Sequence, residues 1–478
     1  MEKKSFASNY FYQIVYLAVT MVVPLFVAPY LTRTIGKTEI GIYTFVNTFA
    51  YYFIIFAMLG IAKYGPRAIS KNVGDPEREK TSFWSLFLVH AVFSVVALAA
   101  YLAVILFIRD NTRIYFIEAI YVLTALFDVT WFFQGRENFR SVAIVNSLFK
   151  IAEMVLIFLL VKNENDLWKY ALITAVGLLG ANVILFFNAM LTCKPIRVRK
   201  SDCTVHLKPL LVLFVSVIAA TLYTLFDKTL IGLIVGKAEV AVYEYSNKII
   251  NIPKAIALVI GTILYPRICS LVKDENVEEQ EKYIKLSVIV TTFISLVSIF
   301  GLMAVSGELA VVYYGEEFAE CGNVIRILSP LIYIICIGDV VRTGYLLPYG
   351  RDKEFTGCLC ISAAVNLVLS SALIPFIGIY GAVIGTLSAE LFGLVFQIVL
   401  CRKSIRSSTF LKPLLALGVI GAVMFFEIVF LNTVWENGVA TLILKILIGG
   451  FTATVMTLGY LAVFEKGFIR TLRLRKSR

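Results

Sequence analysis

Residues 36–43 read Gly-Lys-Thr-Glu-Ile-Gly-Ile-Tyr, and residues 236–243 read Gly-Lys-Ala-Glu-Val-Ala-Val-Tyr, 200 residues further on. The same offset relates other positions: Asn47 to Asn247, and Pro66-Arg67 to Pro266-Arg267. Apolar segments resemble one another by chance, but Gly, Lys, Glu, Tyr, Asn, Pro and Arg in one register do not easily do so. The pattern therefore predicts an ancient duplication, and with it a fold built from two related halves.

The chain that surrounds this repeat is much more apolar than a water-soluble protein. Of its 478 residues, 59% are hydrophobic and 16% charged, and the mean hydropathy is +0.85. A soluble domain carries roughly 45–50% apolar and about 25% charged residues. Such a chain cannot cover itself with polar surface, so it belongs in a bilayer. The net charge of +12 does not predict nucleic-acid binding, because the position of the charges matters more than their sum.

Apolar runs long enough to span a membrane, which takes about 20 residues, recur along the whole chain. We predict an all-α membrane protein of about fourteen transmembrane helices. The predicted spans are 11–32, 40–60, 82–107, 114–133, 141–161, 169–191, 210–234, 241–264, 283–305, 324–347, 355–375, 379–401, 413–432 and 439–463. The repeat recurs after an even number of spans, so both halves insert in the same direction. That plan has a pseudo-twofold axis along the membrane normal, and we expect the substrate site between the halves.

Domain organisation and orientation follow from the repeat and from the basic residues. We predict an N-lobe at 1–208, a C-lobe at 209–402, and two further spans with a basic cytoplasmic tail at 403–478. One set of loops and the tail carry about 30 Lys and Arg residues, against about 8 on the other side, which places both termini in the cytoplasm. The outer loops are too short to fold into a catalytic domain, and the inner ones too short for a nucleotide-binding domain.

Polar side chains within the predicted spans are the candidates for function, because a charge at mid-bilayer faces a cavity or a partner. Tyr243, Asn247, Asn251 and Lys254 form one stripe along a helix, and Tyr43, Asn47 and Tyr51 form the matching stripe in the first half. The pairs Lys150–Glu153 and Asp339–Arg342 are each three residues apart, so both also fit a local ion pair. Asp227 and Lys228 are adjacent and cannot face each other.

These residues divide by chemistry into three sets. Basic and amide side chains suit an anionic substrate: Arg33, Asn47, Arg67, Lys150, Lys228, Asn247, Asn251, Lys254, Arg267 and Arg342. The acidic candidates for ion coupling are Asp128, Asp227, Asp339 and Glu390. Glu427 and Lys445, as charges without a partner at helical spacing, are further candidates for coupling. Three prolines within the predicted spans could act as hinges or form static kinks: Pro24, Pro29 and Pro253.

Other signals of chemistry are missing from the sequence. Gly36-Lys37-Thr38 resembles the end of a phosphate-binding loop, but Leu31 replaces the glycine that such a loop needs. Eight cysteines give no disulfide or zinc framework. We therefore expect no metal, no catalytic site and no cofactor, and leave the energy source open among a proton gradient, a sodium gradient and the membrane potential.

Short motifs in a fixed order give a resemblance to a known family. They are Pro29-Tyr30-Leu31-Thr32-Arg33, Gly41-Ile42-Tyr43, Trp131-Phe132-Phe133-Gln134-Gly135, Asp227-Lys228, Leu346-Leu347-Pro348-Tyr349-Gly350-Arg351-Asp352-Lys353, Asn366-Leu367 and Gly378-Ile379-Tyr380-Gly381-Ala382. The chain resembles the polysaccharide transporter family of O-antigen flippases (Wzx type). That family belongs to the superfamily that also holds the multidrug and toxin extrusion transporters and the lipid II flippases.

The resemblance implies two six-helix lobes in a V shape plus two extra helices, a pair that helps to hold the lipid tail in the lipid II flippases. It implies that a polyprenyl-pyrophosphate oligosaccharide is moved from the cytoplasmic to the outer leaflet of a bacterial or archaeal cytoplasmic membrane by alternating access. Arg33, Arg67 and Arg267 match family positions. Partners would be membrane lipids and polymerase or glycosyltransferase proteins of the same pathway, with no nucleic acid.

Three alternatives remain open. A drug or cation antiporter of the same superfamily should line its cavity with acids and aromatics, whereas Lys150, Lys228, Lys254 and Arg342 give a basic set. A membrane-embedded glycosyltransferase or polymerase should carry a sizeable outer loop with acidic catalytic residues. A lipid II or teichoic-acid precursor flippase would differ only in its cargo.

Overall fold

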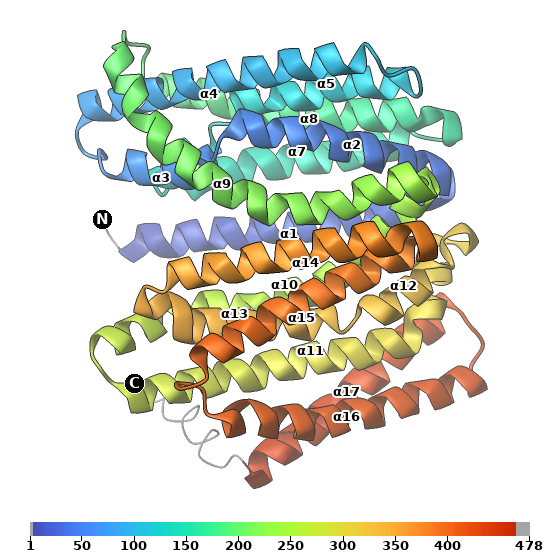
Figure 1. The fold of residues 1–478 in the computed structure, drawn as a ribbon. Coiled ribbons are helices and arrows are strands. Elements are labelled where there is room, and N and C mark those ends of the chain that lie inside the picture. The colour runs from blue at the N-terminus through green and yellow to red at the C-terminus, as the bar shows by residue number, and fades with distance from the viewer. Residues whose placement is uncertain (1–2, 465–478) are drawn as a thin grey trace. The chain divides into compact units, whose positions relative to one another are not determined.

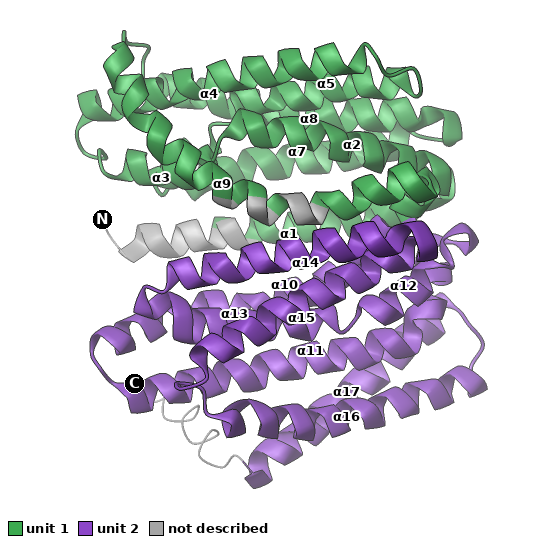
Figure 2. Cartoon of the chain, in the orientation of Figure 1, with its two compact units in different colours: residues 1–241 green, residues 242–478 purple. Residues whose placement is uncertain are grey.

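The structure is a computed structural model that describes residues 3–464, except for the side chains of 3–11, 13–14, 216, 219–220 and 222–224. Helices make up 89% of the described residues, which contain no β-strand. The all-α prediction is therefore confirmed (Figure 1). By the contacts within the chain, residues 1–241 form one compact unit and residues 242–478 a second (Figure 2).

Unit 1 is a bundle of long helices joined by short loops. Its helices are α1 (Lys3–Thr34), α2 (Lys37–Met58), α3 (Ile61–Ser70), α4 (Pro76–Ile105), α5 (Thr112–Phe127), α6 (Thr130–Gly135), α7 (Phe139–Leu160), α8 (Leu167–Thr192) and α9 (Lys200–Leu230). Within it α2, α4, α5, α7 and α8 run alongside one another (Figure 1). An aromatic core surrounds Trp131, which is fully buried and stacks on Phe83 with 5.6 Å between ring centroids.

Unit 2 begins inside the long helix α10 (Lys237–Lys273), whose first five residues belong to unit 1. Its other helices are α11 (Val277–Tyr314), α12 (Cys321–Leu328), α13 (Leu331–Val341), α14 (Asp352–Ile377), α15 (Ile379–Cys401), α16 (Ser407–Val434) and α17 (Val439–Phe464). A π-helical turn, Arg342–Leu346, continues α13.

Small residues explain why α14 and α15 pack closely. Positions 381, 385, 389 and 393 of α15 are Gly, Gly, Ala and Gly, a four-residue repeat of the kind that lets membrane helices approach. A Cβ atom built on Gly381 would lie 2.5 Å from the Ile374 backbone nitrogen, and one on Gly385 would lie 2.3 Å from the Ser370 hydroxyl. This contact brings the polar face of α14 against α15.

The described residues include thirteen helical segments that are long and apolar enough to cross a membrane. They coincide with the predicted spans apart from 210–234, which lies on α9, where several side chains are not described. The predicted domains 1–208, 209–402 and 403–478 stay predictions, as does the cytoplasmic location of both termini. Residues 465–478, which make up most of the predicted basic tail, lie outside the described residues.

Three spans predicted as single helices are broken, one of them 324–347, where α12 ends at Leu328 and α13 begins at Leu331. The span 40–60 ends as α2 at Leu59 (φ 41°) and Gly60 (φ 76°), both in the left-handed region, before α3 begins. A Cβ on Gly60 would stand 3.0 Å from the Phe214 backbone nitrogen, so α9 packs against the break. The span 114–133 breaks between α5 and α6, where Asp128 accepts hydrogen bonds from the Thr130 backbone nitrogen (3.0 Å) and hydroxyl (2.6 Å). Asp128 thereby forms a local turn that ends one helix and starts the next.

Candidate functional site

The polar stripe of α2 faces a buried glutamate on α5. Asn47 donates from Nδ2 to Oε2 of Glu118 at 3.0 Å, and Glu118 is only 1% exposed. Asn47 also hydrogen-bonds Tyr121, one turn further along α5. Glu118 lies near the start of the predicted span 114–133 and is not among the residues predicted from the sequence. An acidic residue within a span was nevertheless a signal that could have revealed it.

Aromatic residues extend this cluster from α2 to α7 and α8. The rings of Tyr43 and Tyr170 lie 4.6 Å apart between centroids, and Tyr43 interacts electrostatically with both Glu118 and Glu153. On α7, Lys150 Nζ lies 3.0 Å from each carboxylate oxygen of Glu153, so the predicted local ion pair is present. The lysine side chain is 32% exposed and the glutamate side chain 11%.

Asp128 belongs to the same part of unit 1. Tyr16 of α1 hydrogen-bonds Asn146 of α7 and interacts electrostatically with Asp128. Around Glu118 and Glu153, polar side chains from α2, α5, α7 and α8 lie in a connected set, and two of the predicted residues, Asn47 and Lys150, each contact a carboxylate within it. We call this set, with Glu118 and Glu153 at its centre, the acidic cluster of unit 1.

The matching stripe of α10 in unit 2 divides among different neighbours. Tyr243 shares a hydrogen bond of 3.1 Å with the hydroxyl of Thr386 on α15. Asn247 donates to the carbonyl of Tyr243 on its own helix at 2.9 Å, and Asn251 is exposed. Lys254 interacts electrostatically with Glu390 of α15. All four residues lie on the one helix α10, as predicted, but their side chains contact different neighbours and do not form a single site.

Asp339 and Arg342 form the predicted local ion pair on α13. The Arg342 guanidinium lies over the ring of Phe355 at 5.3 Å, and a Cβ on Gly261 would stand 2.1 Å from a carboxylate oxygen of Asp339. Helix α10 therefore closes tightly over this pair. The Nε atom of Arg342 is buried with no hydrogen-bond partner among the described residues, so the guanidinium keeps a donor available.

The remaining predicted residues lie at helix ends or hold contacts elsewhere. Arg33 on α1 and Arg67 on α3 are exposed. Arg267 on α10 pairs with Glu279 of α11 at 3.1 Å. Asp227 on α9 is 1% exposed, and both it and Lys228 have interaction partners. The three prolines, Pro24 and Pro29 in α1 and Pro253 in α10, lie inside continuous helices, and their role as hinges stays a prediction.

Lys445 was expected to be unpaired, and that expectation is wrong. Its Nζ lies 2.7 Å from Oε2 of Glu308, and the lysine and glutamate side chains are 0% and 5% exposed. The other glutamate oxygen accepts from the Gly438 backbone nitrogen at 3.1 Å. The pair joins α11 to α17, 137 residues apart in sequence, a contact that spacing rules cannot reveal. Glu427 likewise has a partner, because Thr452 donates to it at 3.1 Å.

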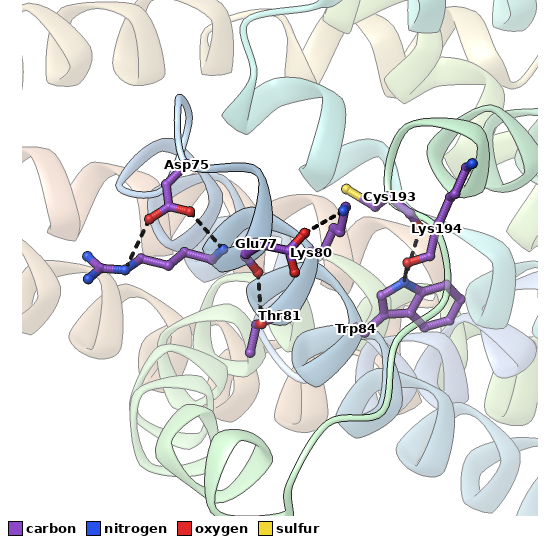
Figure 3. Close-up of polar contacts among 8 residues, drawn as sticks. Asp75, Glu77, Lys80, Thr81, Trp84, Cys193 and Lys194 are labelled. Atoms are coloured by element: carbon purple, nitrogen blue, oxygen red, sulfur yellow. Dashed lines mark hydrogen bonds and ion pairs between the residues drawn. The ribbon is translucent and has the colours of Figure 1, made fainter.

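The end of unit 1 that is predicted to be cytoplasmic is tied together by polar contacts (Figure 3). Asp75 caps α4 by accepting from the Arg78 backbone nitrogen at 3.2 Å. Trp84 donates from Nε1 to the carbonyls of Cys193 (3.1 Å) and Lys194 (3.0 Å), which fixes the segment between α8 and α9 against α4. Burial raises the pKa of the Cys193 thiol to about 11, so it stays protonated at neutral pH.

The described residues contain no group of His, Cys, Asp and Glu that could hold a metal ion, and all eight cysteines are free. The helix bundle and its buried polar clusters define a multi-pass membrane protein. Its fold is that of the lipid II flippase MurJ in an inward closed conformation, with a TM-score of 0.76 at 14% identity over 95% of this chain and 99% of that one. A multidrug resistance MATE family transporter in an inward-facing conformation matches with a TM-score of 0.61 at 14% identity, over 84% of this chain and 99% of that one.

Residues 6–272 match the family described as polysaccharide biosynthesis protein, and the chain belongs to that family. It is 25% identical over 391 residues to a putative O-antigen transporter of Shigella dysenteriae, which covers 78% of this chain and 94% of the relative. The resemblance stated from sequence motifs is confirmed by these matches.

Proposed function

We propose that this protein is a flippase that moves a polyprenyl-pyrophosphate-linked oligosaccharide from the cytoplasmic to the outer leaflet of a bacterial or archaeal cytoplasmic membrane. The observation that carries the proposal is the match to a named O-antigen transporter along 94% of that protein's length, together with the family membership. The fold shared with a lipid II flippase supports the same class of cargo. Membrane lipids and enzymes that build or polymerise the glycan would be its partners.

The cations within the spans would bind the pyrophosphate, and three of them have an acidic neighbour. Lys150 holds Glu153, Arg342 holds Asp339, and Lys254 interacts with Glu390. A pyrophosphate would therefore exchange with a carboxylate for its cation rather than meet a bare positive charge. Arg342 is best placed for this exchange, because its Nε donor has no partner in the described part of the chain and phosphate oxygens can accept from it.

Transport of an anion outward across an inside-negative membrane gains about 2.3 kcal/mol per charge per 100 mV. Coupling to protons or sodium ions would use the carboxylates. To Asp128, Asp227, Asp339 and Glu390 we add Glu118, because it is 1% exposed and its hydrogen bond comes from a neutral amide. Alternating access would proceed by movement of the two related halves, with Pro24, Pro29 and Pro253 as bending points.

We further propose that the protein is a transporter and not a membrane-embedded glycosyltransferase or polymerase. The described helices follow one another through short connections, such as residues 106–111 between α4 and α5, that leave no room for a catalytic domain. A cation antiporter is the other candidate of the same superfamily. The pairs of Lys150 and Arg342 each hold one cation and one acid, so they suit either exchange, and the match to an O-antigen transporter favours the glycolipid over a cationic drug.

The test is translocation of a fluorescent polyprenyl-pyrophosphate glycan in vesicles that contain the purified protein. Replacing Lys228, Lys254 and Arg342 together by Gln should reduce the initial rate at least about tenfold, which corresponds to about 1.4 kcal/mol of barrier. The matched control replaces Lys282, which is 60% exposed and pairs with Glu278 on the surface of α11. Equal rates for the triple variant and the unaltered protein would contradict a role of these three cations.

A further inference from the structure

The two copies of the sequence repeat contact each other in the structure. Lys37 belongs to the first copy and Glu239 to the second, and Lys37 Nζ lies 2.9 Å from Glu239 Oε1. Their side chains are 20% and 22% exposed. The repeat was visible in the sequence, but this pairing of one copy with the other was not. Both residues stand in the first turn of their helices, α2 and α10.

The backbones also approach closely at this point. A Cβ atom built on Gly41 would lie 1.8 Å from the carbonyl oxygen of Lys237 and 2.4 Å from its carbonyl carbon. A backbone carbonyl cannot swing aside as a side chain can, so only glycine fits at position 41 in this arrangement. The second copy has Ala241 at the equivalent position. The repeat therefore departs from its own pattern where the two copies meet.

Lys237 and Phe45 complete the contact. Lys237 Nζ lies 2.9 Å from the centre of the Phe45 ring and 3.2 Å from the carbonyl oxygen of Gly232. A Cβ on Gly232 would stand 2.1 Å from the same ring. The chain enters both helices through glycines in the left-handed region, Gly36 with φ 85° and Gly236 with φ 145°. Such joints rotate at low cost, so the first turns of α2 and α10 can separate without unwinding either helix.

We propose that this contact between the two repeat copies is the gate on the side predicted to face outward, and that it must open to release the cargo. The inference rests on the proposed function, because alternating access needs one side closed while the other is open. The Lys37–Glu239 pair is one-fifth exposed, so water can replace each partner and the pair can break. The fully buried Lys445–Glu308 pair has the opposite character and suits a permanent anchor.

The first arm of the experiment follows the conformation and needs no cargo. A cysteine placed at Ile42, which is 9% exposed beside the contact, is labelled from the outside with a membrane-impermeant maleimide. Lys37→Glu and Glu239→Lys should each raise the labelling rate at least fivefold, and the double exchange should return it to that of the parent. Glu39→Lys, at the equivalent position of the first copy, is the matched control and should leave the rate unchanged. A double exchange that labels as fast as the single variants would overturn the gate.

The second variant tests the backbone approach. Gly41→Ala should raise the labelling rate at Ile42, because the new methyl group forces the two helix starts apart. The control is Gly418→Ala, since a Cβ at Gly418 meets nothing within 4 Å. Labelling that is unchanged in Gly41→Ala would contradict the proposal even if the charge variants fold poorly.

The second arm links the gate to transport. Lys37→Cys and Glu239→Cys are combined and joined by a short, reducible bifunctional thiol reagent. Glycolipid translocation should stop on cross-linking and return after reduction, whereas the native cysteines alone should give no effect. Full cross-linking without loss of translocation would overturn the gate. If the parent moves no glycolipid but the labelling rates follow the predicted order, the proposed cargo is wrong while the gate is supported.

Discussion

Glu118 in unit 1 and Glu308 in unit 2 are both buried, yet their partners are of different kinds. Glu118 accepts from the neutral amide of Asn47 at 3.0 Å, and Glu308 holds the ammonium of Lys445 at 2.7 Å together with a backbone nitrogen. A buried carboxylate with a bonded cation forms a structural pair, whereas a carboxylate that accepts from a neutral amide has no bonded cation to hold its charge. The kind of partner, rather than burial alone, is therefore our reason for proposing Glu118 as a functional residue.

The two repeat-related asparagines show the same divergence. Asn47 reaches across to α5, but Asn247, in the same register, donates to the carbonyl of Tyr243 on its own helix. The two copies of the repeat share the asparagine but not its hydrogen-bond partner. The first half acquired an acidic cluster, and the second half a set of hydroxyl and amide groups on α14 and α15, among them Asn366, Ser370 and Thr386.

Breaking the ion pair of Glu308 should have the largest effect. Lys445→Met leaves a buried carboxylate without its cation and should cost about 3–5 kcal/mol of stability. The measurement is thermal unfolding of the purified protein in detergent. Lys445→Met combined with Glu308→Leu should recover most of the loss, because it removes both charges. The control Lys282→Met, in an exposed pair, should change stability by less than about 1 kcal/mol. Similar losses for Lys445→Met and Lys282→Met would contradict the anchor.

A smaller loss of stability is expected at Asn47, and the equivalent Asn247 of the second copy serves as its control. Asn47→Leu leaves Glu118 without its donor and should cost about 1–3 kcal/mol. Asn247→Leu removes a bond to a carbonyl of its own helix and should cost less than about 1 kcal/mol. Both are measured by thermal unfolding under identical conditions. Equal losses of stability in the two variants would contradict a stronger role for Asn47 than for Asn247.

The smallest effect is expected at Lys150, which is one-third exposed and pairs within one helix turn. Lys150→Met should lower stability by about 1 kcal/mol or less, after screening by water. Its consequence for transport separates two roles. If Lys150 only neutralises Glu153, the variant Lys150→Met with Glu153→Leu should translocate glycolipid at the rate of the parent. A double variant as slow as Lys150→Met alone would instead show that the lysine contacts the cargo.

The sequence predicted what depends on local spacing and hydropathy. Thirteen of the fourteen predicted spans coincide with apolar helical segments of the described residues, and the ion pairs at three-residue spacing, Lys150–Glu153 and Asp339–Arg342, are present. What it missed depends on contacts between distant segments. The break at Leu59 and Gly60 packs against α9, and Lys445 meets Glu308 across 137 residues. The contact between Glu118 and Asn47 likewise depends on the packing of α5 against α2, which the sequence does not show.

The contact between Lys37 and Glu239 is another contact between distant segments that the sequence did not predict. A repeat at an offset of 200 residues implies equivalent positions, but symmetry does not say that the two copies touch. The glycine at 41, where the second copy has alanine, was the local hint, and its meaning became clear from the 1.8 Å approach to the Lys237 carbonyl.

The proposed function is the movement of an anionic, lipid-linked glycan across the membrane. The most direct test measures the initial rate at which a fluorescent polyprenyl-pyrophosphate oligosaccharide crosses the membrane of vesicles containing the protein. A neutral lipid that carries the same glycan and an organic cation serve as competitors. We expect rapid movement of the pyrophosphate-linked glycan, undiminished by either competitor. Transport of the organic cation with no movement of the glycolipid would contradict the proposed function.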